Sequence, residues 1–486
     1  MKQAYSYEEM READRNTIEA AGVTPLQLMM RAGKALKDAV LGAMERIKEN
    51  EVLFVCGGGN NGGDGFVAAQ MLFDMGKTVS VLCLTERFTR ECLTAKRRYE
   101  GDILGRIPRR KYRIVVDCVF GTGISRAPEG VYAALIEFIG SCGAYVIAAD
   151  VPSGLGENGV AFTPCVTADE TICMGQMKTA LLLEEGTDRA GKITVVDVGI
   201  AAVGHGADVL EDKEIRAFFP RRKNNVNKGD FGTACILAGS SAYSGAAFLS
   251  AGACLKSGAG YTRLEVAEDM FPYAIGKLPA CILRKFDANN EEILSCESIA
   301  LGMGAGVTQK LFAFLKKLFS EYTGTLILDA DALNAIAKFG LNLLSVPRTC
   351  KLVLTPHLKE FSRLSGIQIF DIRRDMVGIA KKFAKKFDLT LLLKSNSSVI
   401  TDGVRVTLNA TGSPAQAKGG SGDVLSGFLA GTCARGISPF DACCVAAYVC
   451  GRAGEIAASE VGEYCCDASD LITYIPRAVK HICGLK

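Results

Sequence analysis

Two glycine-rich segments contain polar side chains of the types that bind phosphates or move protons. The first runs from Cys56 to Gly65, reads CGGGNNGGDG, and directly follows an apolar run. Glycine lets the backbone approach a ligand closely, and a helix that begins here would point unpaired N–H groups at that ligand. A plain turn needs neither the asparagines nor the aspartate, so we favour a ligand-binding loop over a structural turn.

Polar residues also follow two later apolar runs. Asp117 lies just before an FGTG segment, and Asp150 begins a DVPSG segment that contains Ser153. In an open parallel sheet the carboxyl ends of the strands line one crevice. Asn61, Asp117 and Ser153 are therefore candidates to converge as oxygen ligands of a hard cation, although each could instead cap a helix or form a turn.

The second glycine-rich segment, residues 418–425, reads KGGSGDVL and leads into an apolar stretch. Backbone amides at a helix start can hold a developing phosphate charge. Asp423, in the first turn of the predicted helix, could take the proton of an attacking hydroxyl in phosphoryl transfer. The alternative is an acidic residue that only interacts with the helix dipole. The segment is not a Walker A loop, because no GK[ST] follows the glycines.

A parallel sheet in each half of the chain is needed to position these segments. Short apolar runs separated by amphipathic stretches are typical of such a sheet covered on both faces. Before the first run, Ser6 and Thr24 have the capping patterns of two helix starts. Residues 399–406 predict a β-hairpin with a type I′ turn at Asp402-Gly403, and the chain is predicted to be helical after Gly422. The runs are residues 52–56, 79–84, 114–120, 145–149 and 193–198, then 233–238, 261–266, 299–302, 325–328, 351–355 and 389–394.

Length and composition favour a folded protein with more than one domain. A chain of 486 residues corresponds to roughly two or three domains, and 49% hydrophobic with 22% charged residues is typical of globular proteins. The texture changes to charged and basic-polar residues after about residue 204, so we place the boundary between domains 1–211 and 212–486. Both are predicted to be of the α/β class.

Charge and cysteine content exclude several classes of function. A net charge of +3 provides no large basic surface for nucleic acid or for an anionic membrane. The 19 cysteines form no CxxC pair and only 3 histidines accompany them, so a Cys/His zinc site is not expected. No signal-peptide core is present, and the longest uncharged run, 231–255, is interrupted by Gly and Ser. We expect a cytoplasmic protein with reduced thiols.

The polar segments of the first half resemble the NAD(P)H-hydrate epimerases. That family has a GxGNNGGDG loop, a VxDxxFGTG strand end and a DxPSG strand end in this order, and residues 28–33 (LMMRAG) add a matching helix segment. The resemblance covers about residues 5–205, with Met30 where the family usually has Glu. It implies a Rossmann-like, three-layer α/β/α domain and K⁺ coordination by Asn61, Asp117 and Ser153.

The same resemblance implies a reaction and a set of contacts. Epimerases interconvert the R and S hydrates at C6 of the damaged nicotinamide ring, which requires a group that helps hydroxide leave and return. Asp150 is our candidate acid/base, and a nearby K⁺ would favour its charged form and so the base role. The implied substrate contacts are Asn60, Asn61, Gly62, Gly63, Asp64, Gly121, Thr122, Gly123, Ile124, Ser125, Arg126, Ala127 and Asp150.

The second half resembles the ribokinase-like ADP/ATP-dependent NAD(P)H-hydrate dehydratases. The matching segments are KGDFG at 228–232, YSGA at 243–246, LTPH at 354–357, LKSNSSVITDG at 393–403 and KGGSGDVLSG at 418–427. The resemblance covers roughly residues 215–485 and implies a ribokinase-like α/β domain. The implied hydrate contacts are Ala246, Gly306, His357 and Asp423, and the implied nucleotide contacts are Lys394, Ser395, Asn396, Ser397, Ser398 and Gly422.

In the implied dehydratase reaction, Asp423 activates the C6 hydroxyl of the S hydrate. That hydroxyl takes a phosphoryl group from ADP, or from ATP, with Mg²⁺, and the ester then eliminates to give NAD(P)H; from ADP the other products are AMP and phosphate. Met303 for Pro, Ser395 for Gly, and Leu358-Lys359 for Pro-Gly depart from the family pattern and bear on nucleotide preference.

The leading interpretation is thus a bifunctional nicotinamide nucleotide repair enzyme acting on NADH and NADPH hydrates. A vitamin or sugar kinase in the second half, and a first half that binds without catalysis, stay open as alternatives. Apolar helix faces in both halves are compatible with subunit contacts, so we expect a homo-oligomer.

Overall fold

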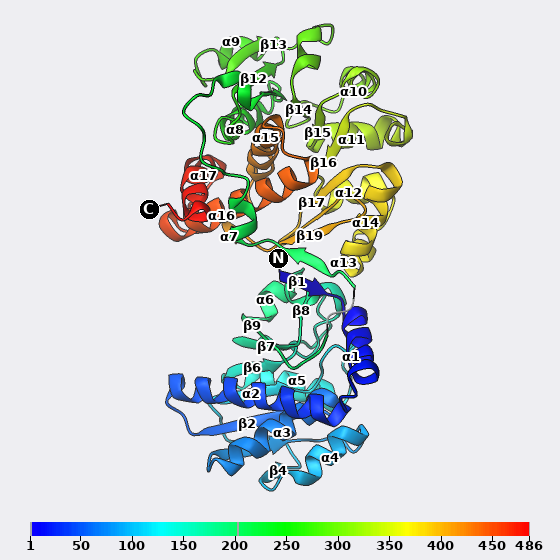
Figure 1. Cartoon of the computed structure of the whole chain (residues 1–486), viewed down its shortest axis with the longest axis vertical. Coiled ribbons are helices and arrows are strands. Elements are labelled where there is room, and N and C mark those ends of the chain that lie inside the picture. The colour runs from blue at the N-terminus through cyan, green and yellow to red at the C-terminus, as the bar shows by residue number, and fades with distance from the viewer. Residues whose placement is uncertain (1, 202–203, 486) are drawn as a thin grey trace. The chain divides into compact units, whose positions relative to one another are not determined.

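The computed structural model describes residues 2–201 and 204–485, and it divides the chain into two compact units, Gln3–Ala207 and Asp208–Lys486 (Figure 1). Lys2 groups with the second unit. Within the described residues, no helix combines the length and the apolarity needed to cross a membrane.

The first unit is built on a parallel sheet of 7 strands in the order β4-β3-β2-β5-β6-β7-β9. The strand order changes direction between β2 and β5, and the crevice at such a switch point is the usual ligand site of open parallel sheets. The strands are β2 (Glu51–Cys56), β3 (Thr78–Leu82), β4 (Asp102–Leu104), β5 (Ile114–Cys118), β6 (Tyr145–Ala149), β7 (Glu170–Met174) and β9 (Lys192–Val196).

Helices cover both faces of this sheet. Alternate residues of β2 enter opposite cores: Phe54 packs with the α2 and α3 side chains, and Val55 packs with α5. The capping boxes at Ser6 and Thr24 begin α1 and α2 as predicted. The three-layer α/β/α arrangement expected for the first half is thereby confirmed. The helices are α1 (Tyr7–Ala21), α2 (Pro25–Ile47), α3 (Asn60–Asp74), α4 (Arg90–Arg98), α5 (Val131–Ser141) and α6 (Gly186–Arg189).

A small parallel pair lies beside the main sheet of the first unit. It joins β1 (Lys2–Tyr5) to β8 (Met177–Lys178), with Tyr5 opposite Lys178. Neither this pair nor β7 was predicted. The pair matters because β8 carries a lysine into the interior.

The second unit contains the sheet order β13-β12-β11-β14-β15-β16-β17-β18-β19-β10. The strands from β13 to β17 are parallel and repeat the order of the first sheet, with the switch point between β11 and β14. The strands are β10 (Ala207–Val209), β11 (Thr233–Leu237), β12 (Tyr261–Val266), β13 (Ile282–Lys285), β14 (Ser298–Leu301), β15 (Thr325–Leu328), β16 (Lys351–Leu354), β17 (Thr390–Leu393), β18 (Ser398–Thr401) and β19 (Val406–Asn409).

Helices α8, α15 and α16 form the largest core of the second unit against this sheet. The three helices after Gly422 agree with the predicted helical end of the chain. The helices are α7 (Asp212–Arg216), α8 (Ser244–Cys254), α9 (Phe271–Ala274), α10 (Gln309–Glu321), α11 (Ala330–Phe339), α12 (Leu358–Ser365), α13 (Ile369–Arg374), α14 (Met376–Phe387), α15 (Ser421–Ala434), α16 (Pro439–Val461) and α17 (Ala468–Cys483).

The predicted hairpin is present as β18 and β19, which pair antiparallel, but its predicted turn type is wrong. A type I′ turn needs a positive φ at both central residues, and of the pair only Gly403 has one, at 88°. Asp402 instead accepts hydrogen bonds from the backbone amides of Val404 and Arg405 at 3.0 and 2.8 Å. Its carboxylate thus organises a longer loop through an Asx-type turn.

Candidate active sites

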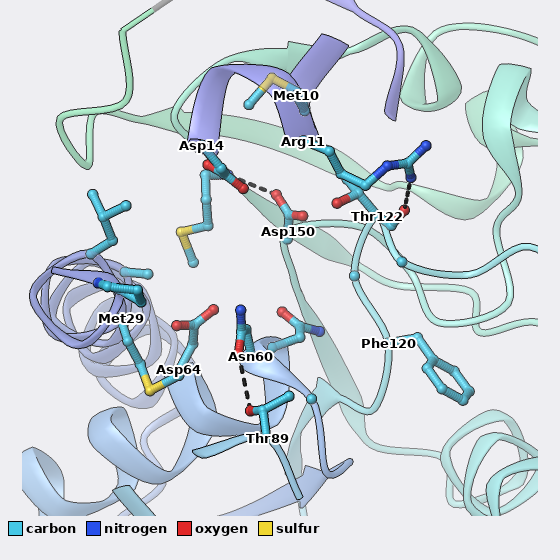
Figure 2. Close-up of a pocket in the computed structure, with 18 of the residues that line it drawn as sticks. Met10, Arg11, Asp14, Met29, Asn60, Asp64, Thr89, Phe120, Thr122 and Asp150 are labelled. Carbon is cyan, nitrogen blue, oxygen red and sulfur yellow. Dashed lines mark hydrogen bonds between the residues drawn. The ribbon is translucent and has the colours of Figure 1, made fainter. Parts of the chain in front are cut away.

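A cavity of about 490 Å³ opens at the carboxyl ends of β2, β5 and β6 in the first unit (Figure 2). Helices α1 and α2 add side chains to its wall, among them Arg11, Asp14 and Met29. Of the expected substrate contacts, Asn60, Asn61, Asp64, Gly121, Thr122, Gly123 and Asp150 line it. The remaining ones, Gly62, Gly63, Ile124, Ser125, Arg126 and Ala127, are not part of its lining.

The glycines of the first segment let α3 begin close against the sheet. A Cβ on Gly62 would lie only 2.0 Å from the Gly57 carbonyl oxygen. Gly59, at the N-cap position, provides no side-chain cap, so backbone amides of the first turn stay available to an anionic ligand. Asn60 begins the helix, and its Oδ1 accepts a hydrogen bond from the Thr89 hydroxyl at 3.1 Å.

The residues expected to bind potassium gather around the segment after β5. The Ser153 amide and hydroxyl donate to the two Asp117 carboxylate oxygens at 2.8 and 2.6 Å, and the Phe120 amide donates to the Ser153 hydroxyl at 2.8 Å. Asn61 is buried. It also lies close to this segment, since a Cβ added to Gly121 would be 3.6 Å from the Asn61 Cγ.

The side chains of this group fit a potassium ion. Among the residues that the structure describes, neither polar atom of the buried Asn61 amide has a hydrogen-bond partner, which is costly unless a ligand satisfies them. Burial raises the pKa of Asp117 to about 6, although hydrogen bonds from Ser153 oppose this, so a neighbouring cation would balance a buried charge. Within the described ranges, no cluster of three or more His, Cys, Asp or Glu side chains is suited to hold a metal.

Asp150 enters the cavity from the end of β6 with a backbone φ of 67°, a left-handed conformation that is unusual for a non-glycine residue. Its Oδ1 accepts hydrogen bonds from the Met174 amide at 3.2 Å and from the Lys178 ammonium at 2.5 Å. Figure 2 shows Asp14, Asp64 and Asp150 directed at the same open space.

Two of these acids differ from ordinary surface carboxyls. Burial, with a smaller contribution from Asp150, raises the pKa of Asp14 to about 6. Burial also raises the pKa of Asp64 well above its usual range, and the charges of Asp150 and Asp14 add to the effect. The cavity therefore contains two carboxyl groups that hold their protons more strongly than surface acids do.

In the second unit, Asp423 lies in the first turn of α15. Burial raises its pKa to about 6; Asp329 adds to this rise and Lys394 opposes it. Lys394 donates to Asp329 Oδ1 at 2.7 Å, and the Ser426 hydroxyl donates to Asp329 Oδ2 at 2.7 Å. A Cβ on Gly422 would lie 3.3 Å from Lys394 Nζ. The predicted base and two predicted nucleotide contacts are thus adjacent.

His357 is held next to Lys394 by a parallel backbone bridge. Its Nδ1 caps α12 by accepting hydrogen bonds from the Lys359 and Glu360 amides at 3.1 and 3.3 Å. Burial lowers the imidazole pKa, so the ring is neutral at pH 7 and carries its proton on Nε2. Leu358-Lys359, which stands where the family pattern has Pro-Gly, is therefore compatible with a capped start of α12.

Other expected contacts surround the same group through neighbouring loops. The Gly306 amide donates to Asp331 Oδ2 at 2.8 Å, and Asp331 is one of the charges that raise the pKa of Asp423. Ala246 lies in the first turn of α8 near the loop after β14, where a Cβ on Gly304 would come within 3.1 Å of it. Ser395, Asn396 and Ser397 lie in the β17–β18 connection that follows Lys394, and Ser398 begins β18.

Magnesium is usually bound by one or two carboxylates together with substrate phosphates. Asp329 already accepts hydrogen bonds on both oxygens, and Asp331 holds the Gly306 amide. These residues do not form a cage of their own, and they fit an ion that arrives on the nucleotide.

Three residues at these sites were not predicted: Asp14, Lys178 and Asp329. Asp14 and Lys178 come from α1 and β8, which lie far from the glycine loop along the chain. Asp329 directly follows an apolar run, as Asp117 and Asp150 do, so its place after β15 was the available signal. Met303, a departure from the family pattern, is fully buried in the main core.

Two family models match the chain. One, described as YjeF-related protein N-terminus, matches residues 25–180, and the other, described as NAD(P)H-hydrate dehydratase, matches residues 234–477. Along nearly its whole length the chain is also similar to the bifunctional NAD(P)H-hydrate repair enzyme Nnr of Thermofilum pendens, with 32% identity over 97% of this chain and 95% of that protein.

Solved structures resemble the second unit. An ADP/ATP-dependent NAD(P)H-hydrate dehydratase from Bacillus subtilis, co-crystallised with ATP and Mg²⁺, is 28% identical with a TM-score of 0.51, over 57% of this chain and 99% of its own. A ribokinase-like superfamily protein from Enterococcus faecalis is 23% identical with a TM-score of 0.52, over 57% of this chain and 96% of its own, and supports the fold.

Proposed function

The chain belongs to the family of bifunctional NAD(P)H-hydrate repair enzymes, and on this premise we propose that its two units divide the repair between them. Residues 1–211 interconvert the R and S hydrates of NADH and NADPH. Residues 212–486 convert the S hydrate to NAD(P)H at the expense of ADP, leaving AMP and phosphate. The observation that supports this most is that each unit has an acid in its candidate site, Asp150 in the cavity of the first unit and Asp423 in the first turn of α15 in the second.

In the epimerase unit, inversion at C6 requires hydroxide to leave one face of the ring and water to add to the other. The leaving hydroxide takes up a proton and the adding water gives one back, so a proton donor and an acceptor serve each turnover. Asp150 accepts the proton of the water. Asp64, whose pKa is raised by burial, is placed in the same cavity to supply the other.

A potassium ion held by Asn61, Asp117 and Ser153 would place a fixed positive charge beside this cavity. The unpartnered amide of Asn61 supports the assignment. We expect the first unit to melt at a higher temperature in KCl than in tetramethylammonium chloride of equal ionic strength, and Asn61→Leu to remove the difference. Equal melting temperatures for the unchanged protein would contradict the ion site.

In the dehydratase unit, Asp423 takes the proton of the C6 hydroxyl as that oxygen attacks the terminal phosphorus of the nucleotide. Lys394 stands beside Gly422 at the start of α15, where its charge can meet the phosphates. Mg²⁺, bound with the nucleotide, would neutralise phosphate charge. The neutral His357 imidazole orients the hydrate through its Nε2 proton.

Phosphorus NMR of the reaction with S hydrate and ADP tests this assignment. We expect AMP and inorganic phosphate to appear in equal amounts, with reduced nicotinamide as the third product. A stable phosphorylated hydrate would instead show a kinase, the alternative that a ribokinase-like fold leaves open. Its accumulation in place of phosphate would contradict the proposal.

Two expectations from the sequence are part of this proposal: a cytoplasmic location and a homo-oligomeric state. Light scattering on the purified protein checks the second, because a mass near 51.6 kDa would identify a monomer.

A further inference from the structure

We infer that Lys178 is a positioning residue for epimerisation: it holds one carboxylate oxygen of Asp150, Oδ1, and so leaves the other, Oδ2, to exchange the proton. The inference rests on the proposed function of the first unit and adds a division of labour between the two oxygens.

The Lys178 ammonium is bound at two fixed points. Its side chain is 2% exposed, and Nζ donates to Asp150 Oδ1 at 2.5 Å and to the Met174 carbonyl oxygen at 2.5 Å. Tyr5 of β1 pairs with Lys178 in β8, which fixes the backbone from which the side chain extends. A buried lysine is costly unless its charge is paired, so this arrangement requires an ionised partner.

The two oxygens of Asp150 have different surroundings. Oδ1 accepts from both Lys178 and the Met174 amide. Oδ2 accepts no hydrogen bond from the part of the chain that the structure describes, and it faces Gly121, where an added Cβ would lie 3.3 Å away. Gly121 lines the cavity, so the oxygen without a donor is the one that faces the substrate space.

Several other titratable groups face Asp150. Asp14 of α1 and Asp64 of α3 contribute negative charge when ionised, and Tyr7 and Cys173 are buried neighbours. The cations that line the cavity are Arg11 and Lys178, and Arg11 donates to the Thr122 carbonyl oxygen at 3.0 Å. Of these two cations, Lys178 is the one that contacts Asp150 directly.

This arrangement has a chemical consequence. Water that adds to C6 loses a proton to Oδ2 as the C–O bond forms, and Oδ1 stays hydrogen-bonded to Lys178 throughout. Burial lowers the pKa of Lys178, but Asp150, Cys173 and Asp14 together raise it above the ordinary lysine value, so the lysine remains charged while it holds the base.

The test compares four full-length variants with the unchanged protein. Lys178→Met removes the charge, Lys178→Arg keeps it, and Lys178→Met is also made in an Asp150→Asn background. Lys192→Met is the matched control, because it removes a lysine of the same unit that is 72% exposed and 4.0 Å from Glu170. Epimerisation of R hydrate is followed across pH. An excess of dehydratase activity converts each S hydrate to reduced nicotinamide as it forms, so the appearance of reduced nicotinamide reports the epimerisation rate. The uncatalysed rate is subtracted.

We expect Lys178→Met to lower epimerase kcat by at least about tenfold, with KM changed by less than about twofold. Lys178→Arg should restore most of the lost kcat because it keeps the charge, and Lys192→Met should leave kcat unchanged. In the Asp150→Asn background, Lys178→Met should cause no further loss.

A lysine that only stabilises the fold predicts something else: additive losses in the double variant and a change in KM as large as that in kcat, and either result would overturn the inference. If Lys178→Met does not fold, Lys178→Gln is measured in its place against the same criteria. Absence of epimerisation in the unchanged protein would instead refute the proposed function of the unit, so the two failures are distinguishable.

Discussion

The two acids proposed for catalysis reach their working state by different means. Asp423 depends on burial, which brings its pKa to about 6, with Asp329 and Lys394 acting in opposite directions. Asp150 depends on direct contact with a buried lysine. In both cases a lysine from another segment of the chain adds positive charge near the acid.

Asp423→Asn tests the base of the dehydratase unit. We expect dehydration of S hydrate to fall by at least about 100-fold, since a positioned base contributes this much or more, and epimerisation to continue unchanged. Asp470→Asn, in the first turn of α17, is the matched control and should leave both activities intact. Near-normal dehydration by Asp423→Asn would show that another group takes the proton.

The pH dependence of dehydration follows from the same carboxyl. A base must be ionised to act, so kcat/KM for the S hydrate should be level above pH 7 and fall as the pH drops through about 6. An acid limb near pH 4 would mean that Asp423 retains an ordinary pKa in the working enzyme. Rates at saturating ADP in a buffer series from pH 4.5 to 8.5 provide the measurement.

Sequence could identify the site residues that follow strands or begin helices. Asn61, Asp117, Asp150 and Asp423 stand in patterns whose chemistry is visible along the chain. Lys178 could not be found in this way, because its role depends on β8 folding back beneath Asp150, a contact between residues 28 positions apart.

At the scale of elements, each site depends on how closely a helix start approaches the sheet. In the first unit the Gly62 position tolerates no Cβ, whereas a Cβ on Gly59 would meet nothing within 4 Å. Gly62 is therefore needed for close packing of the helix start, whereas the space around Gly59 would admit a side chain.

Gly62→Ala should lower the stability of the first unit by roughly 1–3 kcal/mol, because the new methyl group overlaps the Gly57 carbonyl and the helix must shift. Gly59→Ala should leave stability almost unchanged. Differential scanning calorimetry on both variants compares them directly. Equal melting temperatures would mean that α3 can move without cost.

The parallel strands of both sheets could be predicted where long apolar runs mark them. β7, which begins with Glu170, and β13, which ends in Arg284-Lys285, were not predicted because each is a short run with charged residues. At the 402–405 loop, the Asp402 side chain rather than its backbone forms the turn. Such side-chain bonding is hard to foresee from a dipeptide.

At the scale of the whole molecule, two units with the same order of parallel strands carry separate sites. The S hydrate is the product of one site and the substrate of the other. Each site consists of residues from its own unit, so neither reaction should need the other site to be active.

Mixing two singly inactivated proteins tests this independence. Asp150→Asn should retain dehydration and Asp423→Asn should retain epimerisation, so an equimolar mixture should restore full repair of mixed hydrates through free S hydrate. Each variant alone with ADP should leave part or all of the hydrate unrepaired after correction for spontaneous epimerisation. A mixture no better than Asp150→Asn alone would show that the sites must lie in one chain.

The central claim is that one chain both epimerises and dehydrates, and recovery of the reduced-nicotinamide absorbance from a mixture of R and S hydrates tests it most directly. With ADP we predict complete recovery at a rate well above spontaneous epimerisation, and without nucleotide no recovery. Recovery that stops at the S share, or that proceeds equally without ADP, would contradict the account.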